Sequence, residues 1–202
     1  AVIAAGVDSM TRVPMGTNLT FHMKEGMGHY KSPGLEEKFP GVMWSQFSGA
    51  EMIADKWSMT KDEIDRFAFE SHRKAIAATQ AGAFAREIVP VTVEAPEGPV
   101  EHTVDEGIRF DATLEGIAGV KLLKEGGKIT AASSSQICDG ATGVMVVNER
   151  GLKALGVKPL ARIHHMTVIG GDPVIMLEAP LPATHHALKK AGMKIDDIDL
   201  FE

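Results

Sequence analysis

The sequence is poor in cysteine, in aromatic residues and in long apolar runs, and the first and last of these shortages each exclude a class of protein. Cys138 is the single cysteine among 202 residues, which excludes an internal disulfide and fits a reducing, cytoplasmic setting. No apolar run approaches the length of a membrane span, so we expect no membrane partner. Aromatic residues make up only 5% of the chain.

Positive charge is also scarce. The chain has 21 Lys and Arg against 27 Asp and Glu, a formal net charge of −6. Because phosphate backbones are bound by basic surfaces, this balance argues against a nucleic-acid partner. The histidine pairs His164-His165 and His185-His186 do not predict a metal site, since neighbouring residues in a strand point to opposite faces.

The common signatures of catalysis are missing as well. The chain has no Gly-x-Ser-x-Gly elbow, phosphate-binding loop or dinucleotide fingerprint. Cys138 is followed by Asp139, a neighbour that disfavours the thiolate form a nucleophile needs. We therefore interpret Cys138 as a buried structural cysteine.

What is present is typical of a globular protein. Hydrophobic residues make up 44% and charged residues 24% of the chain, enough for one large domain or two small ones. The first seven residues have the pattern of a buried strand, and residues 198–202 resemble the start of another. We therefore expect an internal piece of a longer protein.

Strands alternate with helices towards both ends of the chain, which favours the α/β class with a large insertion. Residues 17–43 show no stable period, and we expect them to be irregular. The helix after Thr60 has the clearest start, a Thr-Lys-Asp-Glu capping box, with a buried stripe that includes Phe67 and Ala68. Strands are expected at 1–7, 88–94, 100–104, 144–147 and 160–169, and helices at 45–56, 60–82, 83–87, 114–123, 148–156 and 183–191, the last of them preceded by Pro180 and Pro182.

The most informative segment runs from Lys128 to Asn148 and contains three consecutive serines, residues 133–135. Small side chains let a backbone approach a ligand closely, and hydroxyls both donate and accept hydrogen bonds. The segment therefore predicts a ligand-facing loop at residues 131–135. The alternative is an ordinary serine-rich surface loop.

Seven segments, taken together and in order, resemble the thiolase family of acyl-CoA acetyltransferases. Residues 130–141, Thr-Ala-Ala-Ser-Ser-Ser-Gln-Ile-Cys-Asp-Gly-Ala, are similar to the family's Thr-Ala-Gly-Asn-Ala-Ser-x-x-x-Asp-Gly-Ala. Residues 5–14 resemble its Gly-Gly-x-Glu-Ser-Met-Ser-x-x-Pro. The other segments are residues 48–51, 65–91, 105–109 (Asp-Glu-Gly-Ile-Arg), 172–180 and 196–202.

The resemblance implies part of a layered α/β/α/β/α fold with an inserted α+β loop domain that covers an acyl-CoA substrate. By this resemblance, residues 1–8 end the N-terminal core half and residues 9–128 form the loop domain. Residues 129–156 hold the last strand and helix of that half, and residues 157–202 begin the C-terminal half.

The resemblance implies thiolytic cleavage of a 3-oxoacyl-CoA, or the reverse Claisen condensation, through an acyl-cysteine. It places the nucleophilic cysteine upstream of Ala1, and the histidine and second cysteine downstream of Glu202, so we expect no catalytic residue in this chain. Coenzyme A is expected as a substrate, with no separate cofactor. A homodimer or homotetramer is expected for the full-length protein.

Four residues are implied to contact coenzyme A. Ser135 is expected to hydrogen-bond the pantetheine arm, and Ala131 to let the arm pass closely. Arg109 is expected near the adenine or 3′-phosphate end, and Leu123 in the same cleft. The alternative for Arg109 is a surface salt bridge.

The chain also departs from the family pattern. Ala132-Ser133 stands in place of Gly-Asn, so this turn needs a different backbone solution, and residues 17–43 match poorly. Residues 46–51 and 135–136 favour the degradative, lipid- or steroid-type branch. Two other interpretations stay open: a non-catalytic relative that binds coenzyme A or lipid, and a scaffold domain without a ligand.

Overall fold

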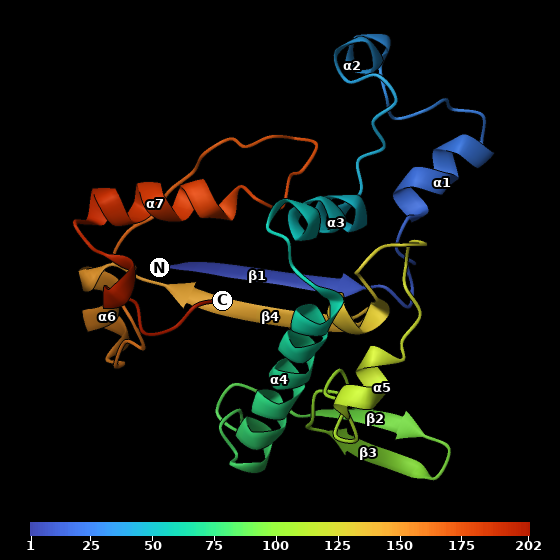
Figure 1. The fold of residues 1–202 in the computed structure, drawn as a ribbon. Helices are drawn as coiled ribbons and strands as arrows, with labels where there is room; N and C mark the ends of the chain where they lie inside the picture. Colours follow the sequence, from blue (N-terminus) through green and yellow to red (C-terminus); the bar gives the residue numbers. More distant parts are fainter. The chain divides into compact units, whose positions relative to one another are not determined.

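The computed structural model describes residues 1–202 (Figure 1). These residues form two compact units. One unit comprises residues 54–136, and the other comprises residues 1–53 together with 137–202. Both helices and strands are present, as the α/β prediction requires. None of the helices is long and apolar enough to cross a membrane.

The split unit contains the longer of the two strand pairs. Strand β1 (Val2–Ser9) pairs antiparallel with β4 (Asp139–Val146), in a register that runs from Val2↔Val146 to Ser9↔Asp139. Both strands were predicted, but each is longer than expected. The prediction that the first strand is buried is wrong: Val7 is 80% exposed, because a two-stranded sheet has two open faces unless another layer packs on it.

Helix α6 of the split unit begins and ends at recognisable signals. Helix α6 is capped by Asn148, whose Oδ1 accepts a hydrogen bond from Gly151 N at 2.9 Å, and it ends at Gly156 with φ +64°. Both ends were predicted. The helices are α1 (Thr17–Lys24), α2 (Pro33–Lys38), α3 (Gln46–Lys56, which crosses into the other unit), α6 (Glu149–Leu155), α7 (Pro180–Ala191) and the 3₁₀ turn η2 (Ile195–Asp197).

Residues 17–43 are more regular than predicted, since they contain α1 and α2. Helix α2 has a start signal that was not recognised: Ser32 Oγ accepts a hydrogen bond from Leu35 N at 3.2 Å, and Pro33 occupies the first helical position. Proline suits that position because its missing N–H has no helical partner there. Helix α1 has no side-chain cap, so its start gave no comparable signal.

Three other predictions are wrong. Residues 160–169 form no strand, and Val168 is 96% exposed; β-branched residues favour a strand only where a neighbouring strand completes the hydrogen-bond ladder. Residues 198–202 form no strand either. Cys138, expected to be buried, is exposed, because it precedes a strand pair that has no covering layer.

The unit at residues 54–136 is built on the 20-residue helix α4 (Lys61–Gln80). The predicted capping box is present: Thr60 Oγ1 accepts from Glu63 N at 3.2 Å, and Glu63 Oε2 accepts from Thr60 N at 2.8 Å. The bond from the Thr60 backbone holds the pKa of Glu63 below its usual range. Gly82, with φ +69°, follows the helix end as predicted.

The remaining elements of this unit are short. The predicted hairpin is present but shifted, as β2 (Val91–Ala95) and β3 (Gly98–His102); Pro90 delays its start, since proline cannot donate to the ladder. Residues 83–87 form turns and not the expected helix. Helix α5 (Leu114–Ala118) is shorter than predicted, and the 3₁₀ turn η1 (Ala131–Ser133) begins the serine run.

The core of the molecule lies in this unit. Its buried apolar side chains are Ala54, Ala68, Ile117 and Ile129. The polar side chains of Asp65 and Thr130 are buried with them. Phe67, expected on the buried stripe of α4, is 80% exposed, because only the narrow face around Asp65 and Ala68 packs against other elements.

Candidate functional site

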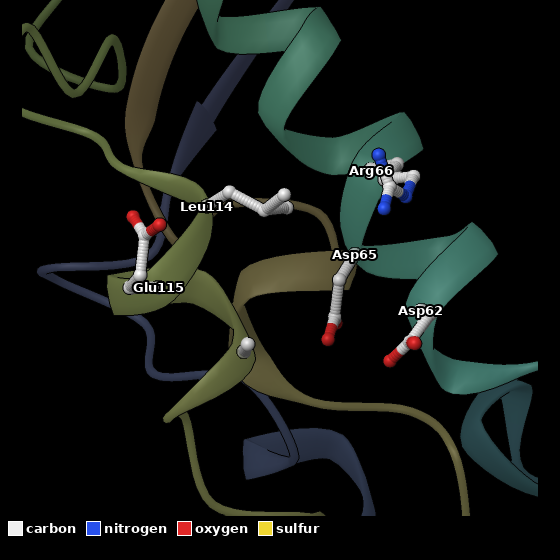
Figure 2. A pocket seen from close by; sticks show the side chains of 6 residues that line it. Asp62, Asp65, Arg66, Leu114 and Glu115 are labelled. Atoms are coloured by element: carbon white, nitrogen blue, oxygen red, sulfur yellow. The ribbon is translucent and has the colours of Figure 1, made fainter.

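Two hollows border helix α4, and they differ in charge. The first, of about 200 Å³, lies between α4 and α5 (Figure 2). Its lining consists of Asp62, Asp65, Arg66, Leu114, Glu115 and Ala118. Figure 2 shows the two aspartates on the α4 side, with Leu114 and Glu115 on the α5 side. Three carboxylates against one guanidinium make this hollow acidic.

Asp65 is the structural centre of the acidic hollow. Lys61 Nζ donates to Asp65 Oδ2 at 2.5 Å and to the carbonyl oxygen of Ala118 at 3.0 Å. The lysine thus ties α4 to the end of α5 and neutralises a buried carboxylate, which would otherwise be costly to desolvate. Asp65 Oδ1 has no hydrogen-bond partner. The hollow therefore suits hydrogen-bond donors and repels anions.

The second hollow, of about 290 Å³, is lined by α4 and by the serine run. From α4 come Ile64, Phe67, Ala68, Ser71 and His72, and from the other side Ala132, Ser133, Ser134, Ser135 and Gln136. This lining contains no carboxylate. Apolar surface together with hydroxyl and amide groups suits an uncharged chain that carries amides, because each amide needs both a donor and an acceptor.

Thr130 fixes the start of the serine run. It is fully buried, and its Oγ1 accepts hydrogen bonds from Ala132 N at 3.2 Å and from Ser133 N at 3.3 Å. Thr130 N in turn donates to Ser133 Oγ at 3.0 Å. Ser58 and Met176 are the residues other than glycine with a positive φ. Ala132 and Ser133, which stand where the family has Gly-Asn, therefore do not adopt a left-handed backbone.

The three serines have different roles. The hydroxyl of Ser133 bonds to Thr130, and Ser134 Oγ donates to the Thr130 carbonyl oxygen at 2.8 Å. Ser135 is exposed and its hydroxyl makes no hydrogen bond within the chain. Two serines therefore hold the segment in place, and the third offers a free donor and acceptor to the hollow.

A salt bridge of Lys128 holds the residues that precede the serine run. Lys128 Nζ lies 2.9 Å from Asp55 Oδ1 and donates to the carbonyl oxygen of Ala54 at 3.3 Å. This contact joins the end of α3 to the residues that lead into Ile129 and Thr130. Because both of these are buried, the serine run starts from a fixed anchor.

Of the four residues predicted to contact a ligand, one lines the second hollow, one is bonded to it, and two do neither. Ser135 lines the second hollow. Arg109 is attached to it through its backbone N, which donates to His72 Nδ1 at 3.3 Å. The Arg109 guanidinium forms no salt bridge, so the alternative considered for it is not observed. Ala131 opens η1, and Leu123 N donates to Ile129 O at 2.9 Å; neither lines the hollow.

His72 and Gln136 are the residues that the sequence analysis missed. Both line the hollow, and both hydrogen-bond the 105–109 segment: His72 accepts from Arg109 N, and Gln136 Nε2 donates to Gly107 O at 2.8 Å. His72 lies one helical turn from Ala68, which was predicted on the buried face of the helix. Its position on that face was therefore the signal that could have identified it.

Comparison with known proteins identifies the family. Residues 1–150 match the family described as "Thiolase, N-terminal domain", and residues 157–202 match "Thiolase, C-terminal domain". The chain is 43% identical to the steroid 3-ketoacyl-CoA thiolase FadA6 of Mycobacterium tuberculosis, over all of this chain and 49% of that protein. It is 40% identical to a 3-ketoacyl-CoA thiolase of Yersinia pestis, over 99% of this chain and 50% of that protein.

A solved structure is similar as well. Human mitochondrial 3-ketoacyl-CoA thiolase matches with a TM-score of 0.78 at 32% identity, over 98% of this chain and 51% of that one. The chain spans about half the length of the relatives it matches. Its mixed α/β structure is thus thiolase-like, and the chain belongs to the thiolase family.

Proposed function

We propose that this chain supplies the coenzyme A-binding part of a thiolase-family acyltransferase acting on 3-oxoacyl-CoA or acyl-CoA. The observation that carries the proposal is the free hydroxyl of Ser135. It is the one serine of residues 133–135 with no partner in the chain, and it faces a hollow without carboxylates.

The chemistry of coenzyme A distinguishes the two hollows. Its pantetheine arm is uncharged and contains two amides, whereas its nucleotide end carries phosphates. The hydroxyl-lined hollow offers Ser135 to the arm, and the 105–109 segment beside it carries the unpaired guanidinium of Arg109. The acidic hollow, with Asp62, Asp65 and Glu115, would repel phosphates.

The other two predicted contact residues have supporting roles in this proposal. Ala131 is exposed and small, so it leaves room for the arm beside the turn. Leu123 is partly exposed and bonded through its backbone to Ile129, next to Thr130. It contributes apolar surface at the edge of the cleft.

The proposed reaction is thiolytic cleavage of a 3-oxoacyl-CoA or the reverse condensation. In thiolysis, the bond between C2 and C3 of the substrate breaks, and the acyl group that begins at C3 passes to a cysteine. C1 and C2 leave as acetyl-CoA after C2 takes up a proton, and a second coenzyme A then accepts the acyl group from the cysteine as a new thioester. The residues of this chain hold and orient the coenzyme A portion, which lowers the entropic cost of bringing the reactants together. None of its residues is proposed as catalytic.

The proposed arrangement has four parts in a layered α/β/α/β/α fold. Residues 1–8 end the N-terminal core half, 9–128 form the substrate-covering domain, 129–156 complete that half and 157–202 begin the C-terminal half. Two observations support it: most of the compact unit at 54–136 falls within the second part, and β1 pairs with β4 across the whole insertion.

A degradative role is the preferred direction. The similarity to a protein named as a steroid 3-ketoacyl-CoA thiolase supports this direction and agrees with the pattern at residues 46–51 and 135–136. Comparing the thiolysis rates of the full-length protein for a steroid side-chain 3-oxoacyl-CoA and for acetoacetyl-CoA would test it. Faster turnover of acetoacetyl-CoA would contradict the steroid-type assignment.

The central test compares two neighbouring serines. Ser135→Ala removes the free hydroxyl, and we expect coenzyme A to bind about tenfold more weakly, the loss of one hydrogen bond, with an unchanged Tm. Ser134→Ala is the matched control: it removes a bond to Thr130, so it should lower the Tm while retaining most of the affinity. Isothermal titration and thermal melts measure both.

Two outcomes would refute the proposal. The first is a wild-type protein that does not bind coenzyme A at concentrations up to the millimolar range. The second is a Ser135→Ala variant that binds coenzyme A as tightly as the wild type.

A further inference from the structure

The segment that carries Arg109 is held by two side chains of the hydroxyl-lined hollow. His72 Nδ1 accepts a hydrogen bond from Arg109 N at 3.3 Å, and Gln136 Nε2 donates to Gly107 O at 2.8 Å. His72 comes from α4 and Gln136 from the end of the serine run. The two bonds thus attach residues 105–109 to both walls of the hollow.

The same segment is also ordered internally. Gly107 N donates to Asp105 Oδ1 at 2.7 Å, and Ala112 N donates to Arg109 O at 3.1 Å. A Cβ at Gly107 would lie 3.0 Å from Asp105 Oδ1 and 3.5 Å from Gln136 Cγ. Because the segment is closely packed at Gly107 and bonded on both sides, its position follows that of His72 and Gln136.

The bond to Arg109 defines the chemical state of His72. A backbone N–H can only donate, so Nδ1 must be the acceptor and the neutral ring must carry its proton on Nε2. The bond fixes the main chain of Arg109 and leaves the guanidinium, which has no partner in the chain, free to contact an anion.

We propose that His72 is a positioning residue that holds the Arg109 main chain so that its guanidinium meets the phosphate-bearing end of coenzyme A. Gln136 assists from the opposite wall. This inference rests on the proposed function, since it takes coenzyme A as the ligand. In this proposal, His72 contributes to selectivity for the nucleotide end of coenzyme A by positioning Arg109.

The test separates the two ends of the ligand. His72→Leu removes the acceptor, and coenzyme A should bind about five- to tenfold more weakly, whereas pantetheine, which lacks the nucleotide, should bind equally well. His72→Asn keeps an acceptor oxygen near the position of Nδ1 and should restore most of the affinity for coenzyme A. Titration measures coenzyme A, and competition measures pantetheine.

A double-mutant cycle tests whether His72 acts through Arg109. In an Arg109→Ala background, His72→Leu should cause no further loss of coenzyme A affinity, because the guanidinium it positions is gone. Additive losses would overturn the inference, and so would an equal loss of pantetheine binding, which would mean that His72 contacts the arm directly.

Gln136→Ala provides a second variant in case His72→Leu does not fold. It removes the other bond to the segment, so it should also weaken coenzyme A binding more than pantetheine binding, and an unchanged preference would contradict the inference. If the wild type binds neither ligand, the proposed function fails. If it binds coenzyme A and His72→Leu binds it equally well, only the positioning role fails.

Discussion

The packed unit at residues 54–136 and the β1–β4 strand pair are built in different ways. The four buried apolar side chains all belong to the packed unit. Strands β1 and β4 are joined by an eight-residue ladder but bury none of their side chains. The first is therefore held by side-chain packing and the second by backbone hydrogen bonds.

This difference explains where the candidate site lies. A binding hollow needs side chains held within a fraction of an ångström, and packing supplies that constraint. The residues that line the hydroxyl-rich hollow, and the bonds that attach Arg109 to it, all fall within residues 54–136. The β1–β4 strand pair contributes no residue to the lining of this hollow.

The largest expected effect comes from removing buried volume in the packed unit. Ile117→Ala truncates a side chain that is 7% exposed, and we expect the free energy of unfolding to fall by about 3 kcal/mol. Val144→Ala in β4 is the matched control: it truncates a side chain that is 59% exposed, so a loss below about 0.5 kcal/mol is expected. Urea denaturation of the 202-residue chain measures both free energies of unfolding, and equal losses would contradict the difference between the two regions.

A smaller effect is expected from removing helix caps in the two units. Thr60→Ala removes the capping box of α4 and should cost about 1 kcal/mol of global stability. Asn148→Ala removes the cap of α6, a helix with no buried residue. Its loss should therefore appear as faster amide exchange within α6, with little change in the global transition. A global loss as large as that of Thr60→Ala would contradict this distinction.

The smallest effect concerns the side chain that locks the end of the strand pair. Asp139 Oδ1 accepts a hydrogen bond from Thr11 N at 2.9 Å, and this bond holds the pKa of Asp139 below its usual value. A carboxyl whose pKa is lower in the folded state stabilises the fold above its unfolded pKa, about 3.9. That contribution is lost as the pH falls through the folded pKa.

Amide exchange at Thr11 between pH 2 and pH 7 provides the measurement. Protection of this amide, corrected for the intrinsic pH dependence of exchange, should decline below about pH 4 in the wild type. In Asp139→Asn, whose side-chain oxygen does not titrate, it should stay level. The same acid decline in both proteins would show that Asp139 does not control this end of the ladder.

Local signals predicted much of the fold. The Thr60 box, the Asn148 cap, and the glycines at positions 82, 156 and 192 marked helix ends because these residues satisfy backbone groups within one turn of themselves. The strand predicted at residues 160–169 is not observed, because a strand depends on a partner strand that no local pattern specifies. Phe67 is exposed and not buried as predicted, because helical spacing predicts a face but not what covers that face.

The candidate site was predicted only in part. The small residues at 131–135 indicated a loop that approaches a ligand, and the resemblance singled out Ser135. The pattern of three serines did not show that Ser133 and Ser134 are bonded to Thr130 while Ser135 is free. Nor did it show that His72, 37 residues from Arg109 along the chain, bonds to it.

The amino-acid sequence by itself determined the family and the capped helices, because each family segment and each helix cap depends on residues close together in the chain. Only the tertiary structure decided which serine hydroxyl is free, which hollow is acidic and which histidine holds Arg109. These features depend on segments far apart in the sequence, and burial and packing select their partners.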